Sequence, residues 1–235
     1  MEKTTSKIRF DKSGYYFAIL IVTVVWGFWR SYFSKFVDGT NKFSDYFHFH
    51  AVMMAIWVVI LIVQPILIRK KQLAIHRVIG KISYFVMPVL LLSVLFVLNS
   101  GLKIGPKTDL TFMTILFPFR DIWLLAIFFT VGVIYRHNIN IHARAMVVTG
   151  IVFIEPSLMR ALGHTFGQAG ALATMVIVVG LLITLIILER KQKSARWIFP
   201  SVLAAYVIAY ALLVSQVQLQ FLDPLVVWFS KLPLT

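Results

Sequence analysis

Residues 44–50, SDYFHFH, place two histidines and an aspartate directly before a long apolar run. Imidazole and carboxylate groups are ligands for zinc, iron and copper, and a histidine can also bind haem iron. Residues two apart on a helix point to nearly opposite sides, so His48 and His50 could share a ligand only if His48 precedes the helix. We predict a metal site formed by Asp45, His48, His50 and His164.

Charged residues inside two apolar runs are a second group that could do chemistry. Arg120 and Asp121 lie within one run, and Glu155 and Arg160 lie within another. Ionisable groups inside membrane spans are costly and are often functional. In an enzyme, Glu155 or Asp121 would act as a base, and Arg160 or Arg120 would hold an anionic group. The alternative is an ion network with a purely structural role.

Two prolines accompany these charges. Pro118 precedes Arg120, and Pro156 follows Glu155. Each proline removes a helical hydrogen-bond donor and frees a backbone carbonyl. Such backbone is tolerated in a membrane where protein covers it or where it lines a cavity.

The remaining histidines allow a haem interpretation. His76 and His142 form a candidate inner pair of axial ligands, and His50 and His164 form a candidate outer pair. His142 and His164 are 22 residues apart, which is about 33 Å along one helix. That length crosses the whole hydrocarbon layer, whereas two haems stacked within a bilayer need ligands that lie closer together. A single haem b is therefore the haem interpretation that we keep. His76 and His142 could instead contact lipid phosphate.

These side chains belong to a very apolar chain. Its 235 residues are 60% hydrophobic and 14% charged, with a mean hydropathy of +0.86. Apolar runs near the length of a membrane span recur along it, which predicts a multi-pass membrane protein with one domain, residues 1–235. The net charge of +14 does not indicate nucleic-acid binding, because no soluble domain is present to carry it. With no cysteine, disulfides and thiolate ligands are excluded.

We predict an all-α fold with seven transmembrane helices. A short interfacial helix is expected to begin at Asp223, within an outer tail of residues 219–235, because Pro224 favours the first turn of a helix. The predicted spans are residues 14–34, 47–68, 79–100, 112–135, 142–163, 169–189 and 197–218.

The distribution of Lys and Arg predicts the orientation. Fifteen of the 23 lie on one side of the seven spans, six lie on the other, and two lie within spans. The positive-inside rule then places the N-terminus, residues 1–13, in the cytoplasm, where the basic loops would meet anionic lipid, and the C-terminus outside. The fifteen are Lys3, Lys7, Arg9, Lys12, Arg69, Lys70, Lys71, Arg77, Lys81, Arg136, Arg144, Arg190, Lys191, Lys193 and Arg196.

Two blocks of sequence carry a resemblance to a known family. The first, HAVMMAIWVVILIVQPILIRKKQLAIHRVIGKISY, contains His50, Gln64 and the pattern His-Arg-x-x-Gly at His76. The second, IHARAMVVTGIVFIEPSLMRAL, contains His142 and Arg160. Together they resemble a family of uncharacterised multi-pass bacterial membrane proteins that carries a domain-of-unknown-function label. The resemblance implies a bacterial cytoplasmic (inner) membrane but no particular activity. It also implies that His50, His76, His142 and Arg160 belong to one set of residues, which favours a cofactor or ligand role.

The leading hypothesis from the sequence is a membrane binding or redox module. Its outer-leaflet polar pocket would hold haem b, a metal ion or a small polar ligand through histidines, loosely as in the two-haem membrane cytochromes b. One alternative is a metal-dependent enzyme that acts on a lipid or another outer-leaflet substrate. Another is a transporter, or a subunit without chemistry in a membrane complex or a homo-oligomer.

Overall fold

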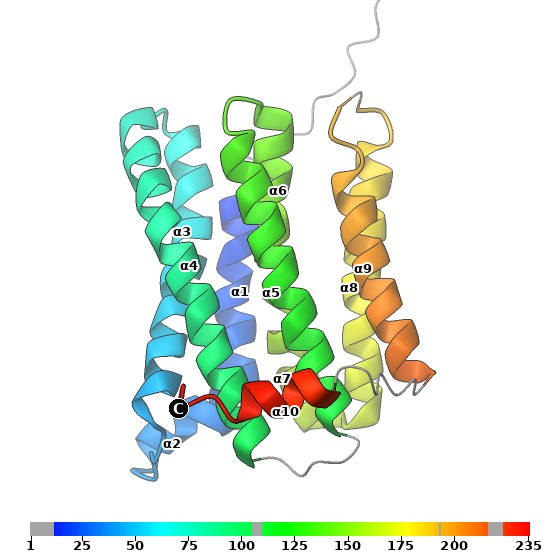
Figure 1. Ribbon diagram of the computed structural model, residues 1–235. Helices are drawn as coiled ribbons and strands as arrows, with labels where there is room; N and C mark the ends of the chain where they lie inside the picture. The colour runs from blue at the N-terminus through cyan, green and yellow to red at the C-terminus, as the bar shows by residue number, and fades with distance from the viewer. Residues whose placement is uncertain (1–11, 105–109, 193, 216–222) are drawn as a thin grey trace, which may run out of the picture.

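The computed structural model describes residues 12–104, 110–192, 194–215 and 223–235. The described part is helical, without strands, and its long helices form an antiparallel bundle (Figure 1). The connections α3–α4, α5–α6 and α8–α9 lie together at one end of the bundle, which we name the hairpin end, and α10 lies across the opposite end, which we name the α10 end. Segments 1–11, 105–109 and 216–222, with residue 193, lie outside the description. They include most of the predicted cytoplasmic N-terminus, the end of the predicted 197–218 span and the start of the predicted tail.

The helices follow the predicted spans with some changes of boundary. They are α1 (Ser13–Phe28), a π-helical turn (Trp29–Phe33), α2 (Ser34–Val37), α3 (Asp45–Arg69), α4 (Leu73–Ile104), α5 (Leu110–Ile134), α6 (Ile139–Ile151), α7 (Ile154–Phe166), α8 (Gln168–Glu189), α9 (Ile198–Val214) and α10 (Asp223–Ser230).

Six helical segments are long and apolar enough to cross a membrane, which indicates a multi-pass membrane protein. They are Ser13–Val37, Asp45–Arg69, Leu73–Lys103, Ile115–Ile134, Ile139–Phe166 and Gln168–Glu189. The predicted seventh span corresponds to Ile198–Val214, which is apolar but shorter. The short helix predicted from Asp223 is confirmed as a helix, and it lies across the end of the bundle (Figure 1).

The predicted fifth span, 142–163, is two helices rather than one. The α-helical pattern is interrupted between Ile151 and Ile154, where the Phe153 amide donates to the Gly150 carbonyl, a three-residue spacing. Pro156 is the physical reason, because its ring nitrogen cannot donate to the carbonyl of Val152 and so cannot continue the helical ladder. The break places Glu155 in the first turn of α7.

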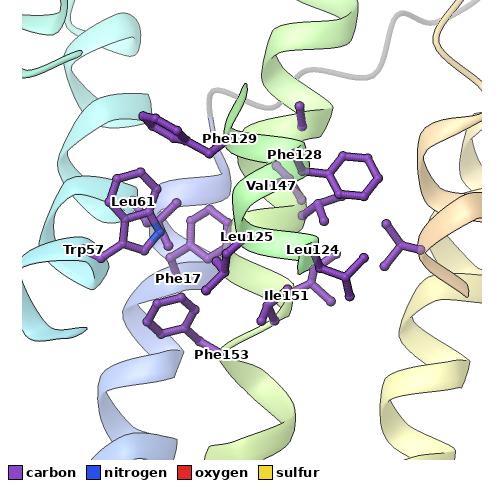
Figure 2. Close-up of a cluster of buried hydrophobic side chains, with 14 of the residues drawn as sticks. Phe17, Trp57, Leu61, Leu124, Leu125, Phe128, Phe129, Val147, Ile151 and Phe153 are labelled. Carbon is purple, nitrogen blue, oxygen red and sulfur yellow. The ribbon is translucent and has the colours of Figure 1, made fainter. Parts of the chain in front are cut away.

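The apolar core draws side chains from α1, α3, α4, α5, α6, α8 and α9, and Figure 2 shows part of it. Trp57 of α3 packs edge-on against Phe129 of α5, with ring centroids 5.6 Å apart, and only 1% of Trp57 is exposed. Phe17 of α1 lies below them and also fills the space beside Gly150 of α6. Membrane helices associate mainly through such close packing, so this core fixes the relative heights of the helices.

Two glycines hold α7 against its neighbours. A Cβ on Gly27 of α1 would collide with the backbone carbonyl of Ser157, and a Cβ on Gly170 of α8 would collide with the backbone of Leu162. Small residues of this kind let helices approach closely in a membrane. Helix α7 is therefore held on two sides, which sets the direction of its charged side chains.

Candidate functional site

Arg120, Asp121 and Glu155 form a buried ionic cluster between α5 and α7. Arg120 donates to Asp121 Oδ1 from Nε at 3.0 Å and from Nη2 at 2.7 Å, and Nη2 also donates to Glu155 Oε2. Only 8% of Arg120 and 3% of Glu155 are exposed. Three of the four charged residues predicted from the sequence therefore meet, and one guanidinium serves both carboxyl groups.

Two tyrosines of α9 complete this cluster. Tyr210 donates its hydroxyl to Glu155 Oε1 at 2.8 Å, and the ring of Tyr206 lies under Arg120, with the guanidinium carbon 4.0 Å from its centroid. The Tyr206 hydroxyl and Arg120 Nη1 are buried without a hydrogen-bond partner among the described residues. Sequence reasoning missed both tyrosines; the available signal was their spacing of four inside an otherwise apolar run, which places them on one helix face.

The break in the fifth span explains why Glu155 can occupy this position. A carboxylate in the first turn of a helix interacts favourably with the unpaired amides and the dipole of that end. Glu155 is in the first turn of α7, and its side chain points toward α5 and α9, where Arg120 and Tyr210 reach it. Pro156 therefore produces a helix end inside the bundle, and Glu155 lies in the first turn of that helix.

Arg160 lies on another face of α7. It follows Glu155 by five residues, a rotation of about 140° on an α-helix. Its Nη1 donates to the backbone carbonyl of Pro156 at 3.0 Å, and its guanidinium carbon lies 4.6 Å from the centroid of the Phe28 ring in α1. Arg160 is therefore not part of the Arg120 cluster. The four charged residues singled out in the sequence do not form one group.

His50 is held by a short chain of hydrogen bonds. Ser93 of α4 donates its hydroxyl hydrogen to the Leu90 carbonyl at 2.6 Å, so its oxygen accepts from His50 Nδ1 at 3.0 Å. A neutral imidazole that donates from Nδ1 carries its lone pair on Nε2. His50 Nε2 has no partner among the described residues, and Arg160 lies within electrostatic range of His50. An anchored imidazole with one free nitrogen is typical of ligand-binding histidines.

The structure does not gather the predicted metal ligands. Helix α3 already begins at Asp45, so both His48 and His50 are helical and point in different directions. His48 Nδ1 is 2.8 Å from the Tyr32 hydroxyl, within a cluster of aromatic rings, whereas the imidazole of His164 is exposed at the end of α7. Across the described ranges, no group of three His, Cys, Asp or Glu is placed to hold a metal ion.

The two predicted haem pairs differ in their geometry. No hydrogen bond or ring contact joins His50 to His164, and α1 contacts both helices that carry them. His76 and His142 lie at the hairpin end within electrostatic range of each other. His142 Nδ1 is 2.8 Å from the Gly132 carbonyl, and His76 Nδ1 is buried without a partner. Neither pair shows the facing imidazoles that would identify a haem site.

A second buried ion pair joins α6 to α8 at the hairpin end. Arg144 donates from Nε to Glu189 Oε1 at 2.6 Å, with both residues at least 97% buried. The Lys and Arg distribution counts Arg144 with the cytoplasmic loops, but α6 begins at Ile139 and carries it inside the bundle. Glu189 lies 45 residues from Arg144 in the sequence, so only the tertiary structure shows that the two residues form an ion pair.

No protein-family model, curated protein or solved structure matches the chain. The resemblance to uncharacterised bacterial membrane proteins therefore stays a prediction, as do the bacterial inner membrane and the haem cofactor. The arrangement of the described side chains is the basis on which a function can be inferred.

Proposed function

We propose that this protein binds a small anionic ligand inside the membrane, between His50 of α3 and Arg160 of α7. The observation that carries the proposal is an intramembrane arginine without a carboxylate partner, beside an imidazole with a free nitrogen. The proposal keeps the binding-module hypothesis from the sequence. It replaces a site built from several histidines with one histidine and one arginine.

The charge of Arg160 supports an anionic ligand. Within the described segments, the buried residues Arg120 and Arg144 are each paired with a carboxylate, whereas Arg160 is exposed and contacts the Pro156 carbonyl and the Phe28 ring. An uncompensated charge within a span is costly, so a bound anion would stabilise it.

The direction of the Arg160 side chain argues against simple snorkelling. Arginine side chains near the ends of a span usually extend toward the headgroups. Arg160 lies six residues before the end of α7 at Phe166, a depth of about 9 Å. Its guanidinium bends back to the carbonyl of Pro156, which is one turn farther from that end. The guanidinium is thus held along α7 rather than extended toward the interface, and its exposed side is open to a ligand.

His50 adds selectivity to this site. Its free Nε2 accepts a hydrogen bond or coordinates a metal centre, while Arg160 takes the negative charge. Suitable ligands therefore include a protonated phosphate, a carboxylic acid with a second donor group, and haem b, whose iron would take Nε2 and whose propionate would take Arg160. Each of these ligands has an anionic group for Arg160 and either a hydrogen-bond donor or a metal centre for His50 Nε2.

We further propose that α9 is a seventh crossing and that the α10 end faces outward. Its 17 residues are about 25 Å long, close to the thickness of the hydrocarbon layer. Basic residues are concentrated at the hairpin end, which supports a cytoplasmic position for that end. The His50–Arg160 site would then lie in the outer half of the bilayer.

Ligand binding by the purified protein in nanodiscs of neutral lipid tests the proposal. We expect inorganic phosphate or hemin to raise the thermal stability of the wild-type protein, and hemin to develop a haem b absorption spectrum if haem is the ligand. Arg160→Gln and His50→Ala should abolish the effect. Arg30→Gln and His48→Ala are matched controls because both residues lie at the same end and face other partners.

The source of the anion is distinguished by the lipid. If free phosphate stabilises the protein in neutral nanodiscs, the ligand is soluble. If only nanodiscs with anionic phospholipid stabilise it, and Arg160→Gln removes the gain, the ligand is a lipid headgroup. The proposal is overturned if no anion affects the wild-type protein or if Arg160→Gln behaves like Arg30→Gln.

Transport of the ligand is a second candidate function, supported by the interrupted span. Discontinuous helices line substrate sites in many transporters, and the α6–α7 break lies one to two turns from Arg160. Uptake of labelled phosphate by proteoliposomes would test it, with Arg160→Gln expected to abolish uptake and Arg30→Gln to leave it unchanged. Equal uptake by the two variants would refute it.

A further inference from the structure

The Arg120 cluster contains an imbalance of charge that its hydrogen bonds do not remove. One guanidinium faces two carboxyl groups, those of Asp121 and Glu155, and among the described residues the other polar groups that face them are the hydroxyls of Tyr206 and Tyr210. With both carboxyl groups ionised, the cluster would carry a net charge of −1, although Arg120 and Glu155 are buried and only 15% of the Asp121 side chain is exposed. Such a charge is expensive without a counter-ion.

We infer that Asp121 and Glu155 together hold one proton, so that the cluster is a neutral proton-binding site within the bundle. The two carboxyl groups and Arg120 then carry one negative and one positive charge. This site is on a different face of α7 from the proposed anion site, and it does not depend on any ligand at Arg160.

The hydrogen-bond pattern places the proton on Asp121. Glu155 accepts on both oxygens, from the Tyr210 hydroxyl at Oε1 and from Arg120 at Oε2. Asp121 accepts both bonds from Arg120 on Oδ1 alone, and Oδ2 has no partner among the described residues. A proton on Oδ2 leaves every described hydrogen bond intact, whereas a proton on either oxygen of Glu155 competes with a donor already there.

Another buried ion pair supplies the internal comparison. Arg144 forms a salt bridge with Glu189, and both residues are buried. That pair carries no excess negative charge, so its carboxylate should be ionised. Glu189 is more deeply buried than Asp121, with 4% against 15% of the side chain exposed, so it is a control for the effect of burial without a second carboxyl group.

Infrared spectroscopy of the full-length protein in lipid at neutral pH tests this inference. We expect the C=O stretching band of one protonated carboxylic acid in the wild-type protein, and we expect this band to shift when aspartate is labelled with ¹³C at its carboxyl carbon. Asp121→Asn removes the group, and Glu155→Gln removes the excess charge and releases the proton. Both variants should therefore lose the band, whereas Glu189→Gln should retain it.

Several results would overturn the inference. A wild-type protein without the band has both carboxyl groups ionised, and a bound cation rather than a proton would then balance them. A band that persists in Asp121→Asn, or that disappears in Glu189→Gln, belongs to another carboxyl group. The wild-type and isotope measurements require no variant, so a variant that fails to fold does not remove the test.

Discussion

The two tyrosines of α9 allow one substitution to be compared at two positions of the same site. Tyr210 donates to Glu155 Oε1 at 2.8 Å, whereas the hydroxyl of Tyr206, one turn earlier, is buried without a partner. Tyr→Phe removes only the hydroxyl and leaves the ring in place. The two variants should therefore change the free energy of unfolding in different directions.

The magnitudes follow from these contacts. A hydrogen bond to a charged group contributes about 1.5–3 kcal/mol in soluble proteins, and hydrogen bonds between membrane helices average about 0.6 kcal/mol. We expect Tyr210→Phe to lower the free energy of unfolding by about 1–2 kcal/mol. Tyr206→Phe removes a buried polar group that has no partner, so it should leave the stability unchanged or raise it by about 1 kcal/mol.

Unfolding of the purified protein in mixed micelles with increasing SDS, followed by tryptophan fluorescence, measures both changes. A loss in Tyr206→Phe equal to or larger than that in Tyr210→Phe would refute the reasoning, and would mean that a water molecule or a ligand bonds the Tyr206 hydroxyl in the membrane.

Two further predictions concern helix packing and orientation. Gly170→Ala should lower the unfolding free energy relative to Gly180→Ala by about 1–3 kcal/mol, because both substitutions gain the same helix propensity but only the Cβ at position 170 collides with the backbone of α7. Equal stability of the two variants in the same SDS titration would contradict this packing. Because the chain contains no cysteine, Lys70→Cys and Lys42→Cys each supply one reactive thiol. In intact cells an impermeant maleimide should label position 42 and not position 70, and the reverse result would invert the proposed orientation.

The sequence predicted the helical class and most boundaries, because membrane spans require long apolar runs that are visible without tertiary information. It placed the start of the third span at residue 79, six residues after α4 begins at Leu73. Basic and polar residues at a helix end look like loop residues in a hydropathy profile. The same effect assigned Arg144 to a loop.

The candidate sites were predicted only in part. Intramembrane charge identified Arg120, Asp121, Glu155 and Arg160, since an ionisable group in an apolar run is conspicuous in any sequence. The sequence did not show which of these four side chains contact one another. Arg120 lies 35 residues from Glu155, and Glu155 lies 55 residues from Tyr210.

The sequence by itself therefore determined that this chain spans a membrane several times and which ionisable residues lie inside it, because both properties depend on local composition. Only the tertiary structure decided that Glu155 joins Arg120 and the α9 tyrosines while Arg160 lies on another face of α7, against Phe28 of α1. The reason is geometric. The rotation between Glu155 and Arg160 on α7 sends them to different neighbours, and those neighbours are fixed by packing between helices that are distant in the sequence.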